Sequence, residues 1–418
     1  MAPRIIILND RARARGGATG LAVLAARLLH ERGREVMFVS GDAGESAALI
    51  DAGVARIALG QEGLSVAQGR LAQIGRGIWN RKAAAFLSDW IAREGRPDDI
   101  WHLHNWAQIW SPSVFSALEP VKSRLIVHAH DYFNACPNGA FWNFPEARQC
   151  SLVPMSSACL RSNCDKRSYP QKLWRVARQV RLGDRFRRPD APQLLLIHPG
   201  MRERFLRSGF QSERIGVLRN PVQPFLPTPI DASRNRGLLF VGRLEQEKGA
   251  LLLAHAAARA DLPVTFVGEG AEAAAIRAAC PHAVLTGWQD PAGIARHAAG
   301  ARALVMPSVV GEPYGLVAVE ALGSGLPVVI SQTALLAPEI VGAGAGWAVD
   351  VTDGAEFARI LAEVCDGSAD IATMSLSAAR VAPQLGLTPQ AWCDGLEAAY
   401  QGLIAGASTR MPAARSIR

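Results

Sequence analysis

The sequence has no long hydrophobic run, although apolar residues make up 49% of its 418 positions. The apolar run in MAPRIIILND ends at Asn9 and Asp10, and no window approaches the roughly 18 uninterrupted apolar residues of a membrane-spanning helix. We therefore expect a cytoplasmic protein without a signal peptide or a transmembrane anchor. The composition, with 20% charged residues, is that of an ordinary globular protein, and the length suits two domains.

Several motifs that carry chemistry are also missing. No Asp-X-Asp triplet occurs, which disfavours the metal-bound diphosphate that such triplets support. There is no G-x-S-x-G hydrolase signature. Neither a zinc finger nor an RNP motif accompanies the basic residues, so nucleic acid is not an expected partner.

Cysteine is scarce, but four of the seven cysteines lie within 29 residues: Cys136, Cys150, Cys159 and Cys164. None of their spacings is C-x2-C. Four thiols this close in sequence could bind structural zinc or pair as disulfides, whereas cytosolic thiols normally remain reduced. The sequence leaves these alternatives open and favours reduced thiols.

Positive charge is concentrated in the first half of the chain. Residues 1–220 hold 32 Lys and Arg against 19 Asp and Glu, a net +13, while residues 221–418 hold 13 against 18, a net −5. In the densest basic stretch, residues 161–188, ten Lys and Arg are interleaved with apolar residues. Such a pattern suits peripheral contact with an anionic inner membrane face or an acidic acceptor, and equally an ordinary amphipathic helix with a solvated basic face.

Short apolar segments alternate with longer helical patterns along the whole chain. In the first half, RIIILN is followed by a helical pattern over residues 19–33 and then by EVMFVSG, which together predict a β-α-β unit. Continuous apolar runs are what parallel strands covered on both faces require. Because the pattern restarts at GLLFVGRL, we expect an α/β protein with two Rossmann-like parallel-sheet domains that face each other across a ligand-binding cleft.

The expected domain boundaries follow from composition. Residues 1–222 form the first domain, and the proline-rich residues 223–236 form a linker. Residues 237–386 form the second domain. We expect residues 387–405 to form a C-terminal helix that packs back on the first domain. Residues 406–418 are expected to form a frayed basic tail.

The segment GEPYGLVAVEALGSGLPVV, residues 311–329, combines features of a ligand site. It follows the expected strand RALVMPS, and Pro313 lies just before or at the start of a helix. The N–H groups of Gly315, Leu316 and Val317 then point out of the helix start, where they and the helix dipole favour an anion. Glycine at 315 also lets a ligand approach the backbone closely.

Two carboxylates, Glu312 and Glu320, lie beside this expected anion site. A glutamate in contact with a phosphate would be repelled, so we expect the carboxylates to face other groups. The paired oxygens of a carboxylate match the hydroxyls of a vicinal diol, as in ribose or a hexose. A ligand with a central diphosphate and a diol-bearing sugar at each end satisfies the whole segment, and such a ligand is a nucleotide sugar. Arg243 and Lys248, in GRLEQEKG after the strand GLLFV, would neutralise its diphosphate.

GEPYGLVAVEA together with FVGRLEQEKG resembles the retaining glycosyltransferases of family 4, which have the two-domain GT-B fold. The resemblance covers nearly the whole chain, with supporting matches in RGGATG, HAHDYF, RNPV and FVGEG. It implies a hexosyltransferase that moves a sugar from a nucleoside-diphosphate sugar to a hydroxyl acceptor, with the first domain on the acceptor side and the second domain binding the donor. It also implies that no metal or other cofactor is needed for catalysis. The net charge of +13 in the first half of the chain, and not the resemblance, is the basis for the hypothesis that the acceptor is a lipid-linked saccharide at the inner membrane face, in polysaccharide assembly.

In the second domain, the resemblance implies that Glu320 holds the ribose and that Glu312 holds the transferred sugar. The amides of Gly315, Leu316 and Val317 would lie against sugar and phosphate.

Elsewhere, the resemblance matches Arg243 and Lys248 to the family's diphosphate-binding pair. It matches Gly16 and Gly17 to a flexible first loop that closes toward the diphosphate. His130 matches the first-domain histidine that contacts the donor sugar near the reacting carbon.

The implied mechanism is retention by front-face attack, in which the leaving diphosphate oxygen helps to deprotonate the acceptor hydroxyl. Glu312, His130, Arg243 and Lys248 are expected to act in this step. A covalent sugar adduct on Glu312 is the less favoured version. Two other functions stay open, a nucleotide-sugar epimerase or hydrolase of the same fold and a non-catalytic nucleotide-binding scaffold. The intact motif residues disfavour both.

Four histidines end two expected strands of the first domain: His102, His104, His128 and His130. They could imitate a metal cluster, but no carboxylate accompanies them at metal-ligand spacing, so we favour cleft-lining and packing histidines and predict no metal site. Asp131 would either orient His130 or cap the following turn. In the irregular insertion that follows, aromatic residues are expected to help shape the acceptor site: Phe141, Trp142 and Phe144.

Overall fold

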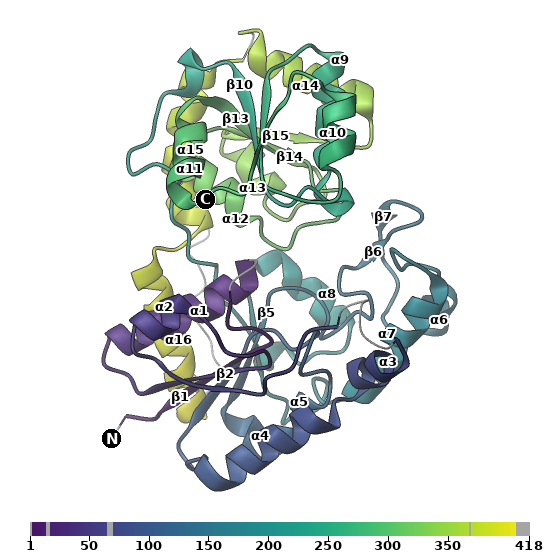
Figure 1. Ribbon diagram of the computed structural model, residues 1–418, viewed down its shortest axis with the longest axis vertical. Helices are drawn as coiled ribbons and strands as arrows, with labels where there is room; N and C mark the ends of the chain where they lie inside the picture. Colours follow the sequence, from purple (N-terminus) through teal and green to yellow (C-terminus); the bar gives the residue numbers. More distant parts are fainter. Residues whose placement is uncertain (1, 14–16, 65–69, 368, 407–418) are drawn as a thin grey trace. The chain divides into compact units, whose positions relative to one another are not determined.

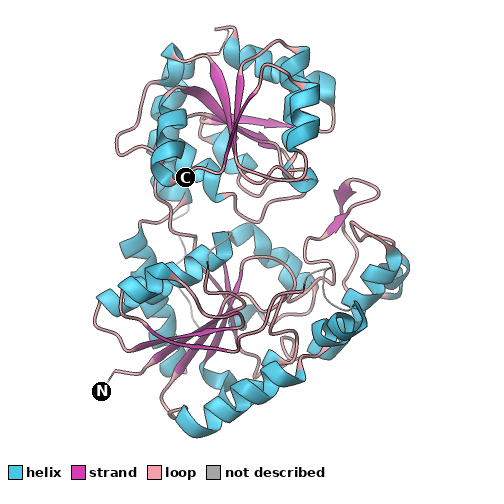
Figure 2. Cartoon of the chain, viewed as in Figure 1, coloured by secondary structure: helices cyan, strands magenta, loops and turns pink. Residues whose placement is uncertain are grey.

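The structure is a computed structural model that describes residues 2–13, 17–64, 70–367 and 369–406. The chain divides into two compact units, Met1–Arg219 with Gln390–Arg418 and Asn220–Pro389. Each unit is built around a parallel β-sheet with helices packed against it (Figures 1 and 2). The predicted α/β class with two Rossmann-like domains is therefore confirmed.

The sheet of the first unit is parallel throughout. Its strands lie in the order β3 (Ala55–Ala58), β2 (Val36–Ser40), β1 (Ile5–Asn9), β4 (Ile100–Leu103), β5 (Leu125–Ala129), β8 (Gln193–Leu196) and β9 (Ile215–Val217). β1 is buried along its whole length, as its continuous apolar run requires. β3 escaped prediction because this edge strand is largely exposed and its sequence, ARIA, carries no apolar run.

Helices of the first unit connect these strands. They are α1 (Gly17–Glu31), α2 (Ala47–Asp51), α3 (Arg70–Ile78), α4 (Arg81–Glu94), α5 (Val114–Ala117), α6 (Ser157–Arg161), α7 (Tyr169–Leu182) and α8 (Arg202–Arg207), with 3-10 turns η1 (Glu119–Arg124), η2 (Pro199–Met201) and η3 (Ser212–Arg214). Caps set their ends: the Ser168 side chain accepts a hydrogen bond from the Gln171 amide at 3.4 Å, at the start of α7. Between β5 and α7 the chain forms an irregular insertion that contains α6 and a small hairpin of β6 (Trp142–Asn143) and β7 (Arg148–Gln149).

The sheet of the second unit reverses its strand order at one point. Its strands lie in the order β12 (Val284–Gly287), β11 (Val264–Val267), β10 (Gly237–Val241), β13 (Ala301–Met306), β14 (Val328–Ser331) and β15 (Gly346–Val349). From β10 the chain builds outward through β11 and β12, then returns to the other side of β10 and continues from β13. The loops after β10 and β13 therefore diverge at a topological switch point, where ligands bind in open α/β sheets.

Helices cover both faces of this sheet. They are α9 (Ala250–Arg259), α10 (Ala273–Ala279), α11 (Pro291–Ala299), α12 (Leu316–Gly323), α13 (Ala337–Gly342), α14 (Gly354–Cys365) and α15 (Ile371–Leu385), with 3-10 turns η4 (Ala232–Arg234) and η5 (Gln246–Lys248). In Figure 1, α9 and α10 lie on one side of the sheet and α11 and α15 on the other. The segment expected as a linker lies against this unit, since the Ala232 amide donates to Ser375 Oγ at 3.1 Å and Arg302 Nη1 donates to the Ser233 carbonyl at 2.7 Å.

The last described helix, α16 (Pro389–Ile404), packs on the first unit, as predicted. Arg32 Nη1 forms ion pairs with Asp394 at 2.5 Å and Glu397 at 3.0 Å. On the buried face of the helix, the Tyr400 hydroxyl shares a hydrogen bond of 2.8 Å with His102 Nδ1. Among the described helices, none has the length and apolar character that crossing a membrane requires.

Candidate functional site

The residues expected to bind the donor gather at the switch point of the second sheet. Arg243 and Lys248 lie in the loop after β10, and Glu312 lies in the loop after β13. Two contacts hold these loops together. The Val309 amide donates to the Glu247 carbonyl at 3.0 Å, and Gly249, at φ 68°, lies so close to the Pro307 carbonyl that a Cβ atom would come within 2.0 Å of it.

The start of α12 offers unpartnered backbone donors. Gly315 is the N-cap, at φ 89° and ψ 62°, and a Cβ there would lie 2.8 Å from Met306 Cε. Among the described residues, the amides of Gly315, Leu316 and Val317 have no hydrogen-bond acceptor. With the partial positive charge of the helix start, these N–H groups can bind an anion or a sugar hydroxyl.

Glu312 and Lys248, predicted to bind different parts of the ligand, are in contact in the structure. Lys248 Nζ and Ser308 Oγ both donate to Glu312 Oε1, the latter at 2.9 Å. The pair is mostly buried, so each charge is neutralised by the other rather than by water. The Lys248 ammonium therefore also holds the Glu312 carboxylate at the switch point.

Arg243 also lies close to two glutamates of its own loop. Its guanidinium pairs with Glu245 and lies 3.9 Å from Glu247. The Arg243 side chain is 55% exposed, and exposed ion pairs of this kind contribute only about 0–1 kcal/mol. The guanidinium can therefore exchange these partners for a diphosphate at little cost.

Glu320 differs from the other charged residues at this edge. It lies within α12, partly buried, and within the described residues its carboxylate has neither a hydrogen-bond nor an ion-pair partner. Burial raises the pKa of Glu320 to about 7. A desolvated carboxylate without a protein donor can accept hydrogen bonds from ligand hydroxyl groups.

In the first unit, the register of β4 against β5 brings four histidines together on one face of the sheet: His102, His104, His128 and His130. His102 Nε2 lies 3.2 Å from His128 Nδ1, and His104 Nδ1 lies 2.9 Å from His130 Nε2. Burial lowers the pKa of His130 to about 3, so its imidazole is neutral at neutral pH. His104 is thus the residue that orients His130.

These contacts bear on the predicted role of the histidines. His102, His104 and His128 are buried and His130 is partly buried, and they are hydrogen-bonded to one another, as packing histidines are. Three ring nitrogens have no partner in the described structure: His104 Nε2, His128 Nε2 and His130 Nδ1. Across the described residues, His102, His104 and His128 are also the one group of three or more His, Cys, Asp or Glu residues with ligand atoms within 4.8 Å of one another. Asp131 caps the following turn, since its Oδ1 accepts from the Phe133 amide at 2.9 Å.

Of the two glycines assigned to the first loop, Gly17 begins α1, and Gly16 lies outside the described residues. The structure corrects the expectation for the insertion aromatics: Phe141 and Trp142 are buried inside the insertion and are unavailable to line an acceptor site.

Two residues near the carboxyl edges of the sheets carry no functional signal in the sequence. Asp10, buried at the end of β1, accepts hydrogen bonds from the amides of Gln108 at 2.7 Å, Ile109 at 2.8 Å and Trp110 at 3.0 Å, and so fixes the loop after β4. Trp288, directly after β12 at the carboxyl edge of the second sheet, is 72% exposed. Trp288 differs from an ordinary surface tryptophan only in its position at that edge. This position is known only once the order of the strands in the sheet is known.

Comparison with known proteins agrees with the features of the second unit. Residues 235–366 match the protein-family model described as "Glycosyl transferases group 1". The chain is 27% identical over 243 residues to D-inositol 3-phosphate glycosyltransferase 1 of Catenulispora acidiphila, which covers 51% of this chain and 53% of that protein. The chain thus matches about half the length of this curated relative.

Solved structures resemble nearly the whole chain. Anabaena HepE in complex with UDP and glucose has a TM-score of 0.65 at 18% identity, over 96% of this chain and 100% of that one. Sucrose-phosphate synthase from Thermosynechococcus elongatus has a TM-score of 0.68 at 15% identity, over 97% of this chain and 100% of that one. At these identities the likeness establishes the fold, and the predicted GT-B architecture is confirmed.

Proposed function

We propose that the protein is a retaining glycosyltransferase that transfers a hexosyl group from a nucleoside-diphosphate sugar to a hydroxyl acceptor. The observation that carries the proposal is the Glu320 carboxylate, which lacks a described protein partner and lies in the helix whose start presents free amides at the switch point. A carboxylate that can accept hydrogen bonds from a diol, in the same helix as N–H groups that can donate to an anion, suits a nucleotide sugar. The glycosyltransferase match over residues 235–366 and the GT-B fold support the same assignment.

In this proposal the second unit binds and activates the donor. Glu320 accepts hydrogen bonds from the ribose diol, and Glu312 accepts them from the transferred sugar. Arg243 leaves its loop partners and, with Lys248, neutralises the charge that develops on the diphosphate as the glycosidic bond breaks. Trp288, at the outer side of the same edge, offers a flat face on which a nucleobase can stack.

His130 belongs to the first unit, and its role rests on the family resemblance. Its neutral imidazole carries one N–H donor and one acceptor nitrogen, and His104 fixes the ring through the 2.9 Å contact. It can therefore orient a sugar hydroxyl without adding a positive charge near the forming oxocarbenium-like centre. The cations that the proposal requires are Arg243 and Lys248, and no metal ion enters it.

The acceptor in this proposal is a saccharide, either free or lipid-linked, and the basic helix α7 supports the lipid-linked form. Leu173 and Val180, seven residues apart on one face of α7, are 46% and 63% exposed. Lys172 and Arg178 of the same helix are instead buried, so α7 is not the simple amphipathic helix with a solvated basic face. Exposed apolar residues among arginines suit a membrane surface with anionic lipids.

The transfer assay that tests the proposal measures nucleoside diphosphate released from UDP-, GDP-, ADP- and TDP-sugars, with and without saccharide and lipid-linked acceptors, in EDTA. We expect release that depends on an acceptor, with a product anomer that matches the donor anomer by proton NMR. Glu312→Gln should lower kcat strongly, whereas Glu356→Gln, an exposed glutamate on α14, is the matched control. Release without any acceptor would favour a hydrolase, and binding without turnover of any donor would favour a scaffold.

A further inference from the structure

The insertion between β5 and α7 has a buried core but little regular structure. Phe141 and Trp142 are almost completely buried, yet the only regular elements described between residues 131 and 168 are the hairpin β6–β7 and the short helix α6. Phe141 and Met155 adopt left-handed backbone conformations, at φ 49° and 65°, which non-glycine residues rarely adopt. Side-chain contacts, more than backbone ladders, therefore hold this region together.

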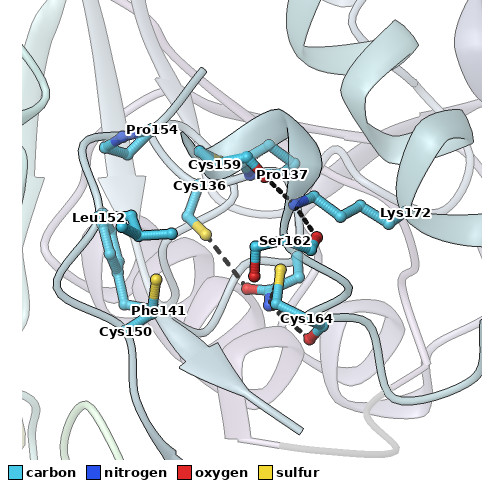
Figure 3. A pocket seen from close by; sticks show the side chains of 11 residues that line it. Cys136, Pro137, Phe141, Cys150, Leu152, Pro154, Cys159, Ser162, Cys164 and Lys172 are labelled. Atoms are coloured by element: carbon cyan, nitrogen blue, oxygen red, sulfur yellow. Dashed lines mark hydrogen bonds between the residues drawn. The ribbon is translucent and has the colours of Figure 1, made fainter. Parts of the chain in front are cut away.

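The four clustered cysteines surround one small cavity in this insertion (Figure 3). Cys136, Cys150, Cys159 and Cys164 all line it, and the space inside is about 10 Å³, enough for a single atom or ion but not for an organic ligand. Figure 3 shows the sulfur atoms of Cys136, Cys150 and Cys164 directed toward its centre. All seven cysteines of the chain are free thiols in the structure.

Asn138 organises two of these thiols. The Cys136 thiol donates to Asn138 Oδ1 at 3.1 Å, and Asn138 Nδ2 lies 3.4 Å from Cys164 Sγ while it donates to the Cys164 carbonyl at 3.1 Å. N–H groups directed at sulfur stabilise thiolates and are the kind of surrounding contact that orients metal ligands.

A fully buried lysine in the wall of the cavity supplies an independent observation. Lys172 has 0% of its surface exposed, and its ammonium donates to the carbonyls of Cys159 and Ser162. In the described structure no carboxylate pairs with it. A buried cation without a counter-ion is strongly unfavourable, so the cavity lacks a negative charge that four neutral thiols do not provide.

We propose that Cys136, Cys150, Cys159 and Cys164 bind a structural Zn²⁺ ion and that Lys172 balances part of the charge of the resulting site. Four thiolates around Zn²⁺ carry a net charge of −2, which is the negative charge that the buried ammonium requires. Binding releases four thiol protons to solvent and involves no oxidation or reduction. Cys150, which is partly exposed, gives the ion access to the cavity.

Zinc binding must shorten the distances between the four sulfur atoms. No three of the four Sγ atoms lie within 4.8 Å of one another, whereas sulfur atoms about 2.3 Å from a tetrahedral zinc lie about 3.8 Å apart. Zinc binding therefore requires the four Sγ atoms to move closer together around the cavity centre. The histidine group of the first unit is a weaker candidate, because its rings already share hydrogen bonds with one another and with Tyr400.

The zinc content of the full-length protein, purified under reducing conditions without chelator and measured by plasma mass spectrometry, tests the proposal. We expect about one zinc per chain in the wild type. The zinc should be lost in Cys136→Ser and Cys150→Ser and retained in Cys280→Ser, a buried cysteine of the second unit. His102→Gln should also retain it, and Lys172→Met should release zinc at a lower chelator concentration than the wild type.

Replacement of zinc by Co²⁺ in the wild type keeps the proposal testable if a cysteine variant fails to fold. A tetrahedral thiolate site gives intense sulfur-to-cobalt charge-transfer absorption, which a histidine site lacks. Wild-type protein that contains no zinc even after incubation with Zn²⁺ in reductant, zinc that persists in both cysteine variants, or zinc lost in His102→Gln would each overturn the proposal. An intact mass that shows disulfides among these cysteines after purification in reductant would overturn it as well.

Discussion

Substitution of Glu320 by glutamine should stabilise the ligand-free protein while weakening donor binding. The Glu320 pKa is raised from 4.5 to about 7, so the folded state holds this proton more tightly than the unfolded chain. Below pH 4.5 the carboxyl is protonated in both states and has no effect. As the pH rises from 4.5 to 7, the wild type loses stability, by up to about 3 kcal/mol, because the unfolded chain releases this proton first.

Glutamine has a similar shape and no charge, so Glu320→Gln should avoid this loss. Because Glu320 is partly exposed, solvent reduces the effect, and we expect a gain of about 1–2 kcal/mol at pH 8 and none at pH 4.5. Urea unfolding at the two pH values, with Glu356→Gln as the matched surface control, measures it.

The same substitution should cost about 1.5–3 kcal/mol of nucleotide affinity, because charge-assisted hydrogen bonds to the ribose diol are lost. The combination of greater stability and weaker binding is typical of a carboxylate kept for a ligand. A Glu320→Gln protein that is less stable than the wild type at pH 8, or that binds the nucleotide equally well, would refute the reasoning.

Three further variants, two single and one double, test other parts of the structure. Gly315→Ala should destabilise the second unit by about 1–3 kcal/mol, because φ 89° strains an alanine and its Cβ meets Met306, and thermal unfolding should show a lower Tm; an unchanged Tm would contradict this. Trp288→Ala should weaken nucleotide binding by about 1–3 kcal/mol in a calorimetric titration without lowering the Tm, and equal affinity would exclude base stacking. Leu173→Ser combined with Val180→Ser should reduce sedimentation with anionic liposomes and leave transfer to a soluble acceptor unchanged; sedimentation equal to that of the wild type would exclude α7 as the membrane contact.

The sequence was sufficient for most of the fold because the fold depends on local pattern. Strands such as β1 and β10 are short apolar runs between helical periodicities, and parallel sheets require such runs. The edge strand β3 lacked this signal because an edge buries little. The C-terminal helix was predicted from its amphipathic pattern, whereas its contact through Tyr400 to His102 joins residues nearly 300 positions apart and carries no local signal.

The chemistry of the site was less predictable because it depends on partners distant in sequence. The motifs predicted that Lys248 binds the diphosphate and that Glu312 binds the transferred sugar. In the structure, the two side chains, 64 residues apart in sequence, are hydrogen-bonded to each other. That Glu320 lacks a partner could be seen only once all its neighbours were placed. Burial of Lys172 was equally unpredictable, since a lysine in a basic helix is usually solvated.

The most direct test of the donor site is a thermal-shift measurement of the purified protein with UDP, GDP, ADP, TDP and their sugars, in the presence of EDTA. A ligand at about 100 times its Kd adds about 2.7 kcal/mol of stability. We predict that one nucleotide family raises the Tm of the wild type and of Glu356→Ala but not that of Glu320→Ala or Arg243→Ala. If no nucleotide raises the Tm, or if both site variants respond like the wild type, the switch point of the second sheet is not the donor site.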